Sequence, residues 1–183
     1  MTLASRSPQR RAILEQLGVD FAVVEPRYEE IDPPGERPEQ LVLTHAVGKA
    51  RSVDAPLILG VDTTVAIDGE SLAKPADERE AAAMLGRLAG RTHTVYSGLC
   101  LRRGAAEVVR LAATAVTFRE LGADDVAWYV ALGEWRGRAG GYAVQGAGAA
   151  LVTEIAGDYT NVVGLPVPAL IDAVGQAGET TGC

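Results

Sequence analysis

The sequence predicts an α/β fold with a mixed β-sheet, and three observations support this prediction. Helical and strand patterns alternate along the chain. The run Leu57–Val61 is wholly apolar, which is typical of a strand buried inside an α/β sheet. The turn pair Asp68-Gly69 and a second turn at Gly104 then place antiparallel hairpins in the same chain. A sheet that contains such hairpins beside buried strands is expected to be mixed.

The predicted helices are marked by their ends. Ser7 is an N-cap residue followed by Pro8 at the first helical position, and Gly18 ends that helix. Asp77 begins a later helix, with Glu80 as its capping-box partner. The expected helices cover about residues 8–17, 39–53, 77–90, 124–132 and 168–174.

The predicted strands are apolar or alternating segments between turn residues. Beyond Leu57–Val61 we expect a hairpin over residues 65–72, two long strands at 94–101 and 108–118, and a strand at 150–155. The segment 137–148 is rich in glycine, and a further turn is expected at Gly157-Asp158.

Length, composition and charge exclude several classes of protein. The 183 residues fit a single domain, 1–183, and no apolar run reaches the roughly 18 residues that a membrane span requires. The N-terminus lacks the apolar segment of a secretory signal, and two cysteines, Cys100 and Cys183, are too few for a disulfide framework. We therefore expect a cytoplasmic protein. Its net charge of −7 argues against a nucleic-acid polymer as partner.

A candidate phosphate site lies at the start of the first helix. Arg10 and Arg11 fall in its first turn, where free backbone N–H groups and the helix dipole attract anions, and Ser5 and Ser7 add hydroxyl groups. The alternative is that both arginines are solvated on the outer face of the helix, and this feature alone favours neither interpretation.

Acidic residues and lysines give a second set of candidates. Asp62 directly follows the buried strand, where sites in α/β sheets commonly lie, and could hold Mg²⁺ or accept a proton from water. Taken alone, this position favours an Asx turn that leaves the strand. Glu29-Glu30 is a second acidic pair that otherwise indicates a solvated loop. Lys49 and Lys74 are the chain's only lysines, although lysines in such places are more often merely solvated.

Several common kinds of site are absent from the sequence. No GxxxxGK[ST] phosphate loop and no GxSxG nucleophile elbow occur. His45 and His93 lie far apart and no cysteine stands at metal-ligand spacing, which argues against zinc. Trp128 and Trp135 suit packing or a partner surface better than base stacking.

Several blocks in order along the chain resemble the Maf family of nucleotide pyrophosphatases. The opening LASRSPQRRAIL is similar to the family's LASxSPRRxxLL, and YEEID, VGKA, GVDTTV and AKP follow in the family's order. MLGRLAGRTHTVYSGL, RAGGYAVQGAGAALV and GDYTNVVGLP resemble later family blocks. Gln9 is the one clear departure, because the pyrimidine-preferring subgroup has arginine there.

The resemblance implies two α/β lobes around an elongated mixed sheet, with a nucleotide-binding cleft between them and usually a homodimer. It implies hydrolysis of a nucleoside triphosphate between the α and β phosphates with a divalent metal, Mg²⁺ or Mn²⁺. Asp62, Lys49 and Lys74 fall on catalytic positions, with Asp62 as general base, and Glu30 and Asp62 on metal positions. The substrate-binding positions are Ser5, Ser7, Gln9, Arg10, Thr63 and Gln145.

The expected substrates are dTTP and UTP, because GVDTTV and AGGYAVQG are closer to that subgroup than to the one acting on 7-methyl-GTP. The alternatives are a pyrophosphatase for 7-methyl-GTP or for many or modified triphosphates, a phosphatase or kinase with the same charged cleft, and a non-catalytic nucleotide-binding regulator of cell division. Only the pyrophosphatases among these release pyrophosphate.

Overall fold

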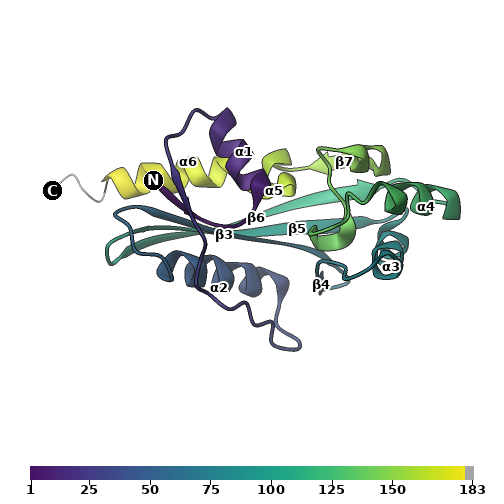
Figure 1. Ribbon diagram of the computed structural model, residues 1–183, viewed down its shortest axis with the longest axis horizontal. Coiled ribbons are helices and arrows are strands. Elements are labelled where there is room, and N and C mark those ends of the chain that lie inside the picture. The colour runs from purple at the N-terminus through teal and green to yellow at the C-terminus, as the bar shows by residue number, and fades with distance from the viewer. Residues whose placement is uncertain (180–183) are drawn as a thin grey trace.

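In the computed structural model, which describes residues 1–179, one seven-stranded mixed sheet runs along the molecule (Figure 1). The strand order is β2-β1-β3-β5-β6-β7, and β4 pairs with β3 outside that path. The bounds are β1 Thr2–Ala4, β2 Ala22–Val24, β3 Ile58–Ile67, β4 Glu70–Leu72, β5 Thr92–Arg103, β6 Ala106–Phe118 and β7 Val152–Ala156. Cys183 lies outside the described residues.

Helices cover both faces of this sheet. The helix α2 lies on one face of the sheet, and α1, α5 and α6 lie on the opposite face. The helices α3 and α4 lie toward the end of the molecule away from the N-terminus (Figure 1). The bounds are α1 Pro8–Gln16, α2 Pro38–Arg51, α3 Glu78–Leu88, α4 Ala123–Leu132, α5 Tyr159–Val163 and α6 Val167–Glu179. No helix within residues 1–179 is both long enough and apolar enough to cross a bilayer.

The buried side chains form separate clusters along the sheet, which agrees with the expected two lobes. At one end, Leu3, Leu14 and Leu59 pack between the sheet and helices α1 and α6, and a smaller cluster packs beneath α2. At the other end, Leu85 and Phe118 belong to the cluster beside α3 and α4. The long strands β3, β5 and β6 connect the two ends.

Close packing brings α2 down onto the middle of the sheet. A Cβ at Gly60 on β3 would lie 2.2 Å from the Ala46 carbonyl oxygen of α2, and a Cβ at Gly98 on β5 would lie 2.1 Å from that of Val42. Side chains here would therefore push the helix away from the sheet. Both glycines hold α2 close enough for its side chains to reach groups on β3.

The structure confirms the predicted α/β class, the principal helices and the hairpin turns. Ser7 and Asp77 cap α1 and α3, and Asp68 and Gly69 both have positive φ, as a type I′ turn requires. The prediction missed β1 and β2, which are three residues each and gain their stability from parallel pairing with distant segments. It also missed the short helix α5. Of the two tryptophans, Trp135 is buried, whereas Trp128 is exposed.

One prediction about the central strand was wrong. Leu57–Val61 does not end before Asp62, because β3 continues to Ile67 and pairs with β5 without a break from Ile58 to Ala66. The polar residues Asp62, Thr63 and Thr64 interrupt the apolar pattern but not the backbone pairing. Asp62 therefore lies within a strand, neither at its carboxyl end nor in an Asx turn.

Candidate active site

The main cleft opens where the sheet changes partners along one edge of β3. The strand β1 pairs with this edge in parallel up to Gly60, and β4 pairs with it antiparallel from Val65 onward. Residues 61–64 have no strand partner on this edge within the described chain. Asp62, Thr63 and Thr64 line the resulting cleft, which has a volume of about 450 Å³. Asp62 therefore lines the cleft from within a strand, and not from a strand end as expected.

The N-terminus of α1 forms one wall of the cleft. The chain leaves β1 at Ala4, passes Ser5 and enters α1 after Ser7, which accepts a hydrogen bond from the Arg10 N–H. The Ser7 hydroxyl also donates to Gln9 Oε1 at 3.1 Å, and Ser5 Oγ accepts from the Ser7 N–H. This wall therefore offers hydroxyl groups and the positive end of a helix, which suit an anion.

Arg10 is fixed on this wall by neutral oxygen atoms. Its Nε donates to the Gly164 carbonyl at 2.8 Å, Nη1 to Ser5 Oγ at 3.2 Å, and Nη2 to Thr63 Oγ1 at 3.1 Å. Burial lowers the pKa of this guanidinium, and the charges of Asp62 and Glu30 oppose that shift. Because the three hydrogen-bonded acceptors are uncharged, the positive charge of Arg10 remains available to an anion in the cleft.

Of the two arginines in the first turn of α1, Arg11 does not belong to the candidate phosphate site. Its Nε bonds Glu15 Oε1 at 2.8 Å on the exposed side of α1, and it does not line the cleft. Adjacent helical positions point about 100° apart around the axis, so only one of the two arginines can face the cleft. Arg10 is that residue, and Arg11 is solvated.

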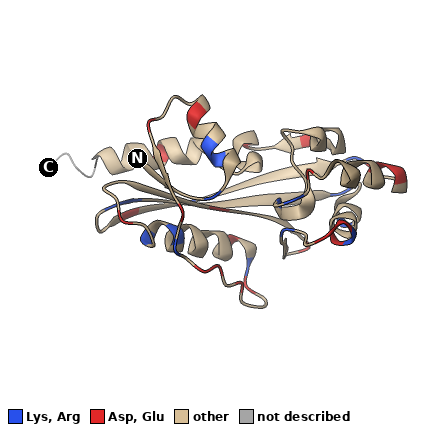
Figure 2. Cartoon of the chain, viewed as in Figure 1, with Lys and Arg blue, Asp and Glu red and all other residues tan. Residues whose placement is uncertain are grey.

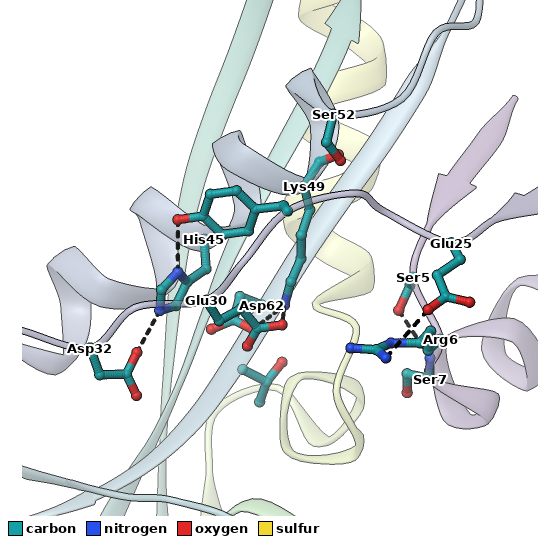
Figure 3. A network of polar contacts seen from close by, with 12 residues as sticks. Ser5, Arg6, Ser7, Glu25, Glu30, Asp32, His45, Lys49, Ser52 and Asp62 are labelled. Carbon is teal, nitrogen blue, oxygen red and sulfur yellow. Dashed lines mark hydrogen bonds and ion pairs between the residues drawn. The ribbon is translucent and has the colours of Figure 1, made fainter.

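A carboxylate–lysine–carboxylate bridge forms the opposite wall. Lys49 of α2 donates from Nζ to Asp62 Oδ1 at 2.6 Å and pairs with Glu30 Oε1 at 2.9 Å (Figure 3). The Lys49 side chain is buried, and the Asp62 side chain is only 13% exposed. Residues from the β2–α2 loop, α2 and β3 thus meet at one ammonium group.

The charge of this wall controls the ionisation of Glu30. Burial alone raises the pKa of the Glu30 carboxyl, but the hydrogen bond and charge of Lys49, with the charges of Lys74 and His45, hold it below its usual range. Glu30 therefore carries a negative charge near neutral pH. Lys74 is exposed in the segment after β4 and lines the cleft, and it makes no hydrogen bond or ion pair within residues 1–179.

The glycine-rich segment closes the far side of the cleft. Arg138, Tyr142 and Gln145 line it, and the buried Nε of Arg138 has no hydrogen-bond partner among the described residues. Tyr142 is held by a hydrogen bond between its hydroxyl and His93 Nε2 at 2.8 Å. Gln145 is exposed, so its amide is free to contact a ligand.

The structure brings all the site residues that the family resemblance implies to this one cleft. They share positions on its lining and come from six separate segments: Ser5, Ser7, Gln9, Arg10, Glu30, Lys49, Asp62, Thr63, Lys74 and Gln145. In Figure 2, basic positions are seen on α1 and α2 and acidic positions on the loop that leads into α2. No group of three or more His, Cys, Asp and Glu within residues 1–179 forms a metal site by itself.

Sequence reasoning missed several residues of the cleft. Arg6, Asp32, His45 and Arg138 also line it. Arg138 could have been found, because it opens the RAGGYAVQG block that carries Gln145. His45 was considered only as a zinc ligand, and its hydrogen bonds depend on contacts between α2 and the preceding loop that no local pattern indicates.

Comparison with known proteins agrees with the resemblance seen in the sequence. A family model described as Maf-like protein matches residues 1–177. The dTTP/UTP pyrophosphatase of Symbiobacterium thermophilum is 44% identical over 182 residues, which cover 97% of this chain and 94% of that protein. The proteins of the same name from Gloeobacter violaceus and Moorella thermoacetica are 45% and 46% identical, over 96% and 91% of this chain and 95% and 89% of their own lengths. A match of this extent shows that the chain belongs to the Maf-like protein family.

Proposed function

We propose that this protein hydrolyses nucleoside triphosphates to the monophosphate and pyrophosphate, with dTTP and UTP as preferred substrates. The observation that carries the proposal is the cleft itself. It places the Lys49–Asp62 pair opposite Arg10 at the N-terminus of α1. Relatives named dTTP/UTP pyrophosphatase, matched over nearly their whole length, support the substrate class.

The cations of the cleft account for binding of a triphosphate. Arg10 contributes a guanidinium held by neutral partners, Lys74 an ammonium group without an ion-pair partner in residues 1–179, and Arg138 a buried Nε–H without an acceptor. Phosphoryl transfer depends mainly on neutralising charge and on positioning the nucleophile. This protein of net charge −7 thus places three cations without ion-pair partners among residues 1–179 in one cleft.

Asp62 is the proposed general base. Its carboxylate lies at the open edge of β3, and the hydrogen bond from Lys49 fixes its orientation. In this role Asp62 accepts a proton from the attacking water, which replaces pyrophosphate at the α phosphate. Lys49 holds Asp62 and Glu30 together, and its charge offsets the repulsion between the two carboxylates.

The donor atoms of this wall fit a divalent metal such as Mg²⁺ or Mn²⁺. Glu30 and Asp62 present carboxylate oxygens to a common point, now contacted by Lys49 Nζ. Magnesium is commonly held by one or two carboxylates together with substrate phosphates, so a larger cluster is not required. When bound, the metal would neutralise charge on the triphosphate, while Glu30 and Asp62 would hold it.

Selection of the base is assigned to Gln145, on the glycine-rich segment that lines the cleft. The amide of Gln145 can pair with the adjacent carbonyl and N–H groups of a pyrimidine. The hydroxyl of Thr63 contacts Arg10, Ser97 and the Gly164 carbonyl, so Thr63 supports the position of Arg10. Gln9 supplies a neutral amide where the related subgroup has arginine, and we therefore expect broader selectivity that admits CTP.

A panel of triphosphates tests the proposal. The natural ribo- and deoxyribonucleoside triphosphates and 7-methyl-GTP are assayed with Mg²⁺ and with Mn²⁺, and the products are identified. Pyrophosphate with the highest kcat/KM for dTTP or UTP is expected. Release of orthophosphate or of a nucleoside diphosphate would identify a phosphatase or kinase instead, and binding without turnover would identify a regulator. A purine or 7-methyl-GTP optimum would overturn only the proposed substrate preference.

The cellular setting of the protein is proposed as well. The chain is expected to act as one domain and as a cytoplasmic homodimer, with exposed Val23 and Val24 on the edge strand β2 available for association. Cys100 is a free, buried cysteine, and burial raises the pKa of its thiol to about 11, which suits a protein without a disulfide there. Sedimentation of the purified protein measures the oligomeric state directly.

A further inference from the structure

Glu30 lies on a loop that its own backbone does little to hold in place. The β2–α2 loop, residues 25–37, contains no helix or strand. Apart from the Arg37 carbonyl, which accepts from the first turn of α2, its one backbone–backbone hydrogen bond outside the strand pairing in the described chain runs from the Glu36 N–H to the Pro33 carbonyl. The position of Glu30 relative to Asp62 must therefore depend on side-chain contacts between this loop and the rest of the protein.

His45 makes two of these contacts, one on each side of Glu30. Its Nδ1 bonds the Tyr28 hydroxyl at 3.1 Å, and its Nε2 bonds Asp32 Oδ1 at 2.7 Å (Figure 3). A carboxylate can only accept, so Nε2 donates to Asp32, while the Tyr28 hydroxyl is the partner of Nδ1.

A notch in α2 receives the Tyr28 ring. A Cβ at Gly48 would lie 2.2 Å from the ring carbon Cε2 of Tyr28, so only glycine leaves room for the ring there. Gly48 lies on α2 between His45 and Lys49. The same stretch of helix thus seats Tyr28, bonds Asp32 and presents Lys49 to Glu30. His45 is 3% exposed and cannot be satisfied by bulk solvent instead.

We propose that His45 and the Gly48 notch are positioning elements that hold the loop so that Glu30 meets Lys49 and Asp62. The geometry is that of a two-point attachment, with Tyr28 two residues before Glu30 and Asp32 two residues after it. The inference rests on the proposed function, because it gives Glu30 a task in metal and phosphate binding. It assigns to His45 and Gly48 a role that is exerted through the position of Glu30.

Two variants separate positioning from folding. His45→Leu removes both hydrogen bonds and keeps an apolar side chain of similar size, while Gly48→Ala pushes the Tyr28 ring out of its notch. Alanine has the higher helix propensity, which offsets part of the stability lost when the Tyr28 ring leaves its notch. The matched control is Gly86→Ala in α3, where a Cβ meets nothing within 4 Å. Glu36→Gln is the control on the loop, since Glu36 is exposed and its side chain makes no hydrogen bond or ion pair within residues 1–179.

The activity measurement is the Mg²⁺ concentration that gives half-maximal turnover. Both variants are expected to raise it about tenfold, as loss of supporting partners around a metal site commonly does, with kcat largely restored at saturating Mg²⁺. The controls should match the wild type. In a Glu30→Gln background His45→Leu should have no further effect. A tenfold effect that persists there would overturn the proposal, as would losses that follow Tm.

A second measurement does not depend on activity. Trypsin cleaves after Arg27, which is exposed on the loop beside Tyr28. Release of the loop should speed cleavage at this bond about tenfold, because proteolysis follows the population of the open segment. Unchanged cleavage in His45→Leu and Gly48→Ala would refute the two-point attachment. If the wild type releases no pyrophosphate from any triphosphate, the proposed function fails while this measurement still decides the attachment.

Discussion

The two sides of the open β3 edge hold their cations in opposite ways. On one side, Lys49 lies between Glu30 and Asp62, so its charge is largely neutralised within the protein. On the other side, Arg10 is hydrogen-bonded only to hydroxyl and carbonyl oxygens. Successive residues of a strand point to opposite faces, which places Asp62 and Thr63 against different helices although they are neighbours.

This difference indicates a division of tasks. A cation without a charged hydrogen-bond partner is suited to bind the phosphate groups, since it gains a full ion pair when the substrate arrives. A lysine between two carboxylates instead orients the groups that act on the water and on the metal. The comparison predicts that substitutions on the Asp62 side act mainly on kcat and those on the Arg10 side mainly on KM.

The largest effect is expected from Asp62→Asn. An amide still accepts the hydrogen bond from Lys49, so the fold should persist, but it cannot accept a proton from water. We expect turnover to fall by about 10²-fold or more. Circular dichroism and Tm measure folding, and initial rates measure turnover. Near-full activity in a folded variant would reduce Asp62 to a structural residue of β3.

The second effect is on binding, and neighbouring arginines supply the test. Arg10→Ala removes a charged contact to phosphate and should raise KM about 10- to 100-fold. It also removes the hydrogen bonds from Arg10 to Ser5, Thr63 and Gly164, so a lower Tm is expected. Arg11→Ala removes only an exposed pair with Glu15 and should change neither quantity. A rise in KM as large in Arg11→Ala would contradict the assignment.

The two lysines of the cleft give a further test of the division between effects on kcat and effects on KM. Lys49→Ala should lower kcat strongly, because it frees two facing carboxylates, whereas Lys74→Ala should raise KM by about tenfold through loss of a phosphate contact. Arg103→Ala, at the exposed end of β5, is the control and should behave as the wild type. Equal losses in all three variants would indicate a general loss of stability and not two separate tasks.

The smallest effect concerns base choice. Gln9→Arg adds a forked charged donor beside the N-terminus of α1 and should sharpen the preference for dTTP and UTP over CTP by a few-fold. The ratio of kcat/KM values for these three substrates is the measurement. An unchanged ratio would remove Gln9 from the selective part of the cleft.

Sequence patterns within short segments predict most of the secondary structure of this protein. Caps at Ser7 and Asp77, the turn at Asp68-Gly69 and the strand periodicities predict most elements, because these signals act within one turn or one strand pair. The motif resemblance also indicated the site residues by position, and all of them line one cleft. It could not indicate His45 or Gly48, whose roles arise from packing of the β2–α2 loop on α2.

The sequence by itself thus determined which side chains are present and which helices and turns carry them. Only the tertiary structure decided that Asp62 lines a cleft, since the edge of β3 is open where β1 stops at Gly60 and β4 begins at Val65. It also decided that Arg10 and not Arg11 faces the cleft. The physical reason is that strand pairing and helix packing join residues up to more than a hundred positions apart, such as Arg10 and Gly164, and no local pattern encodes such contacts.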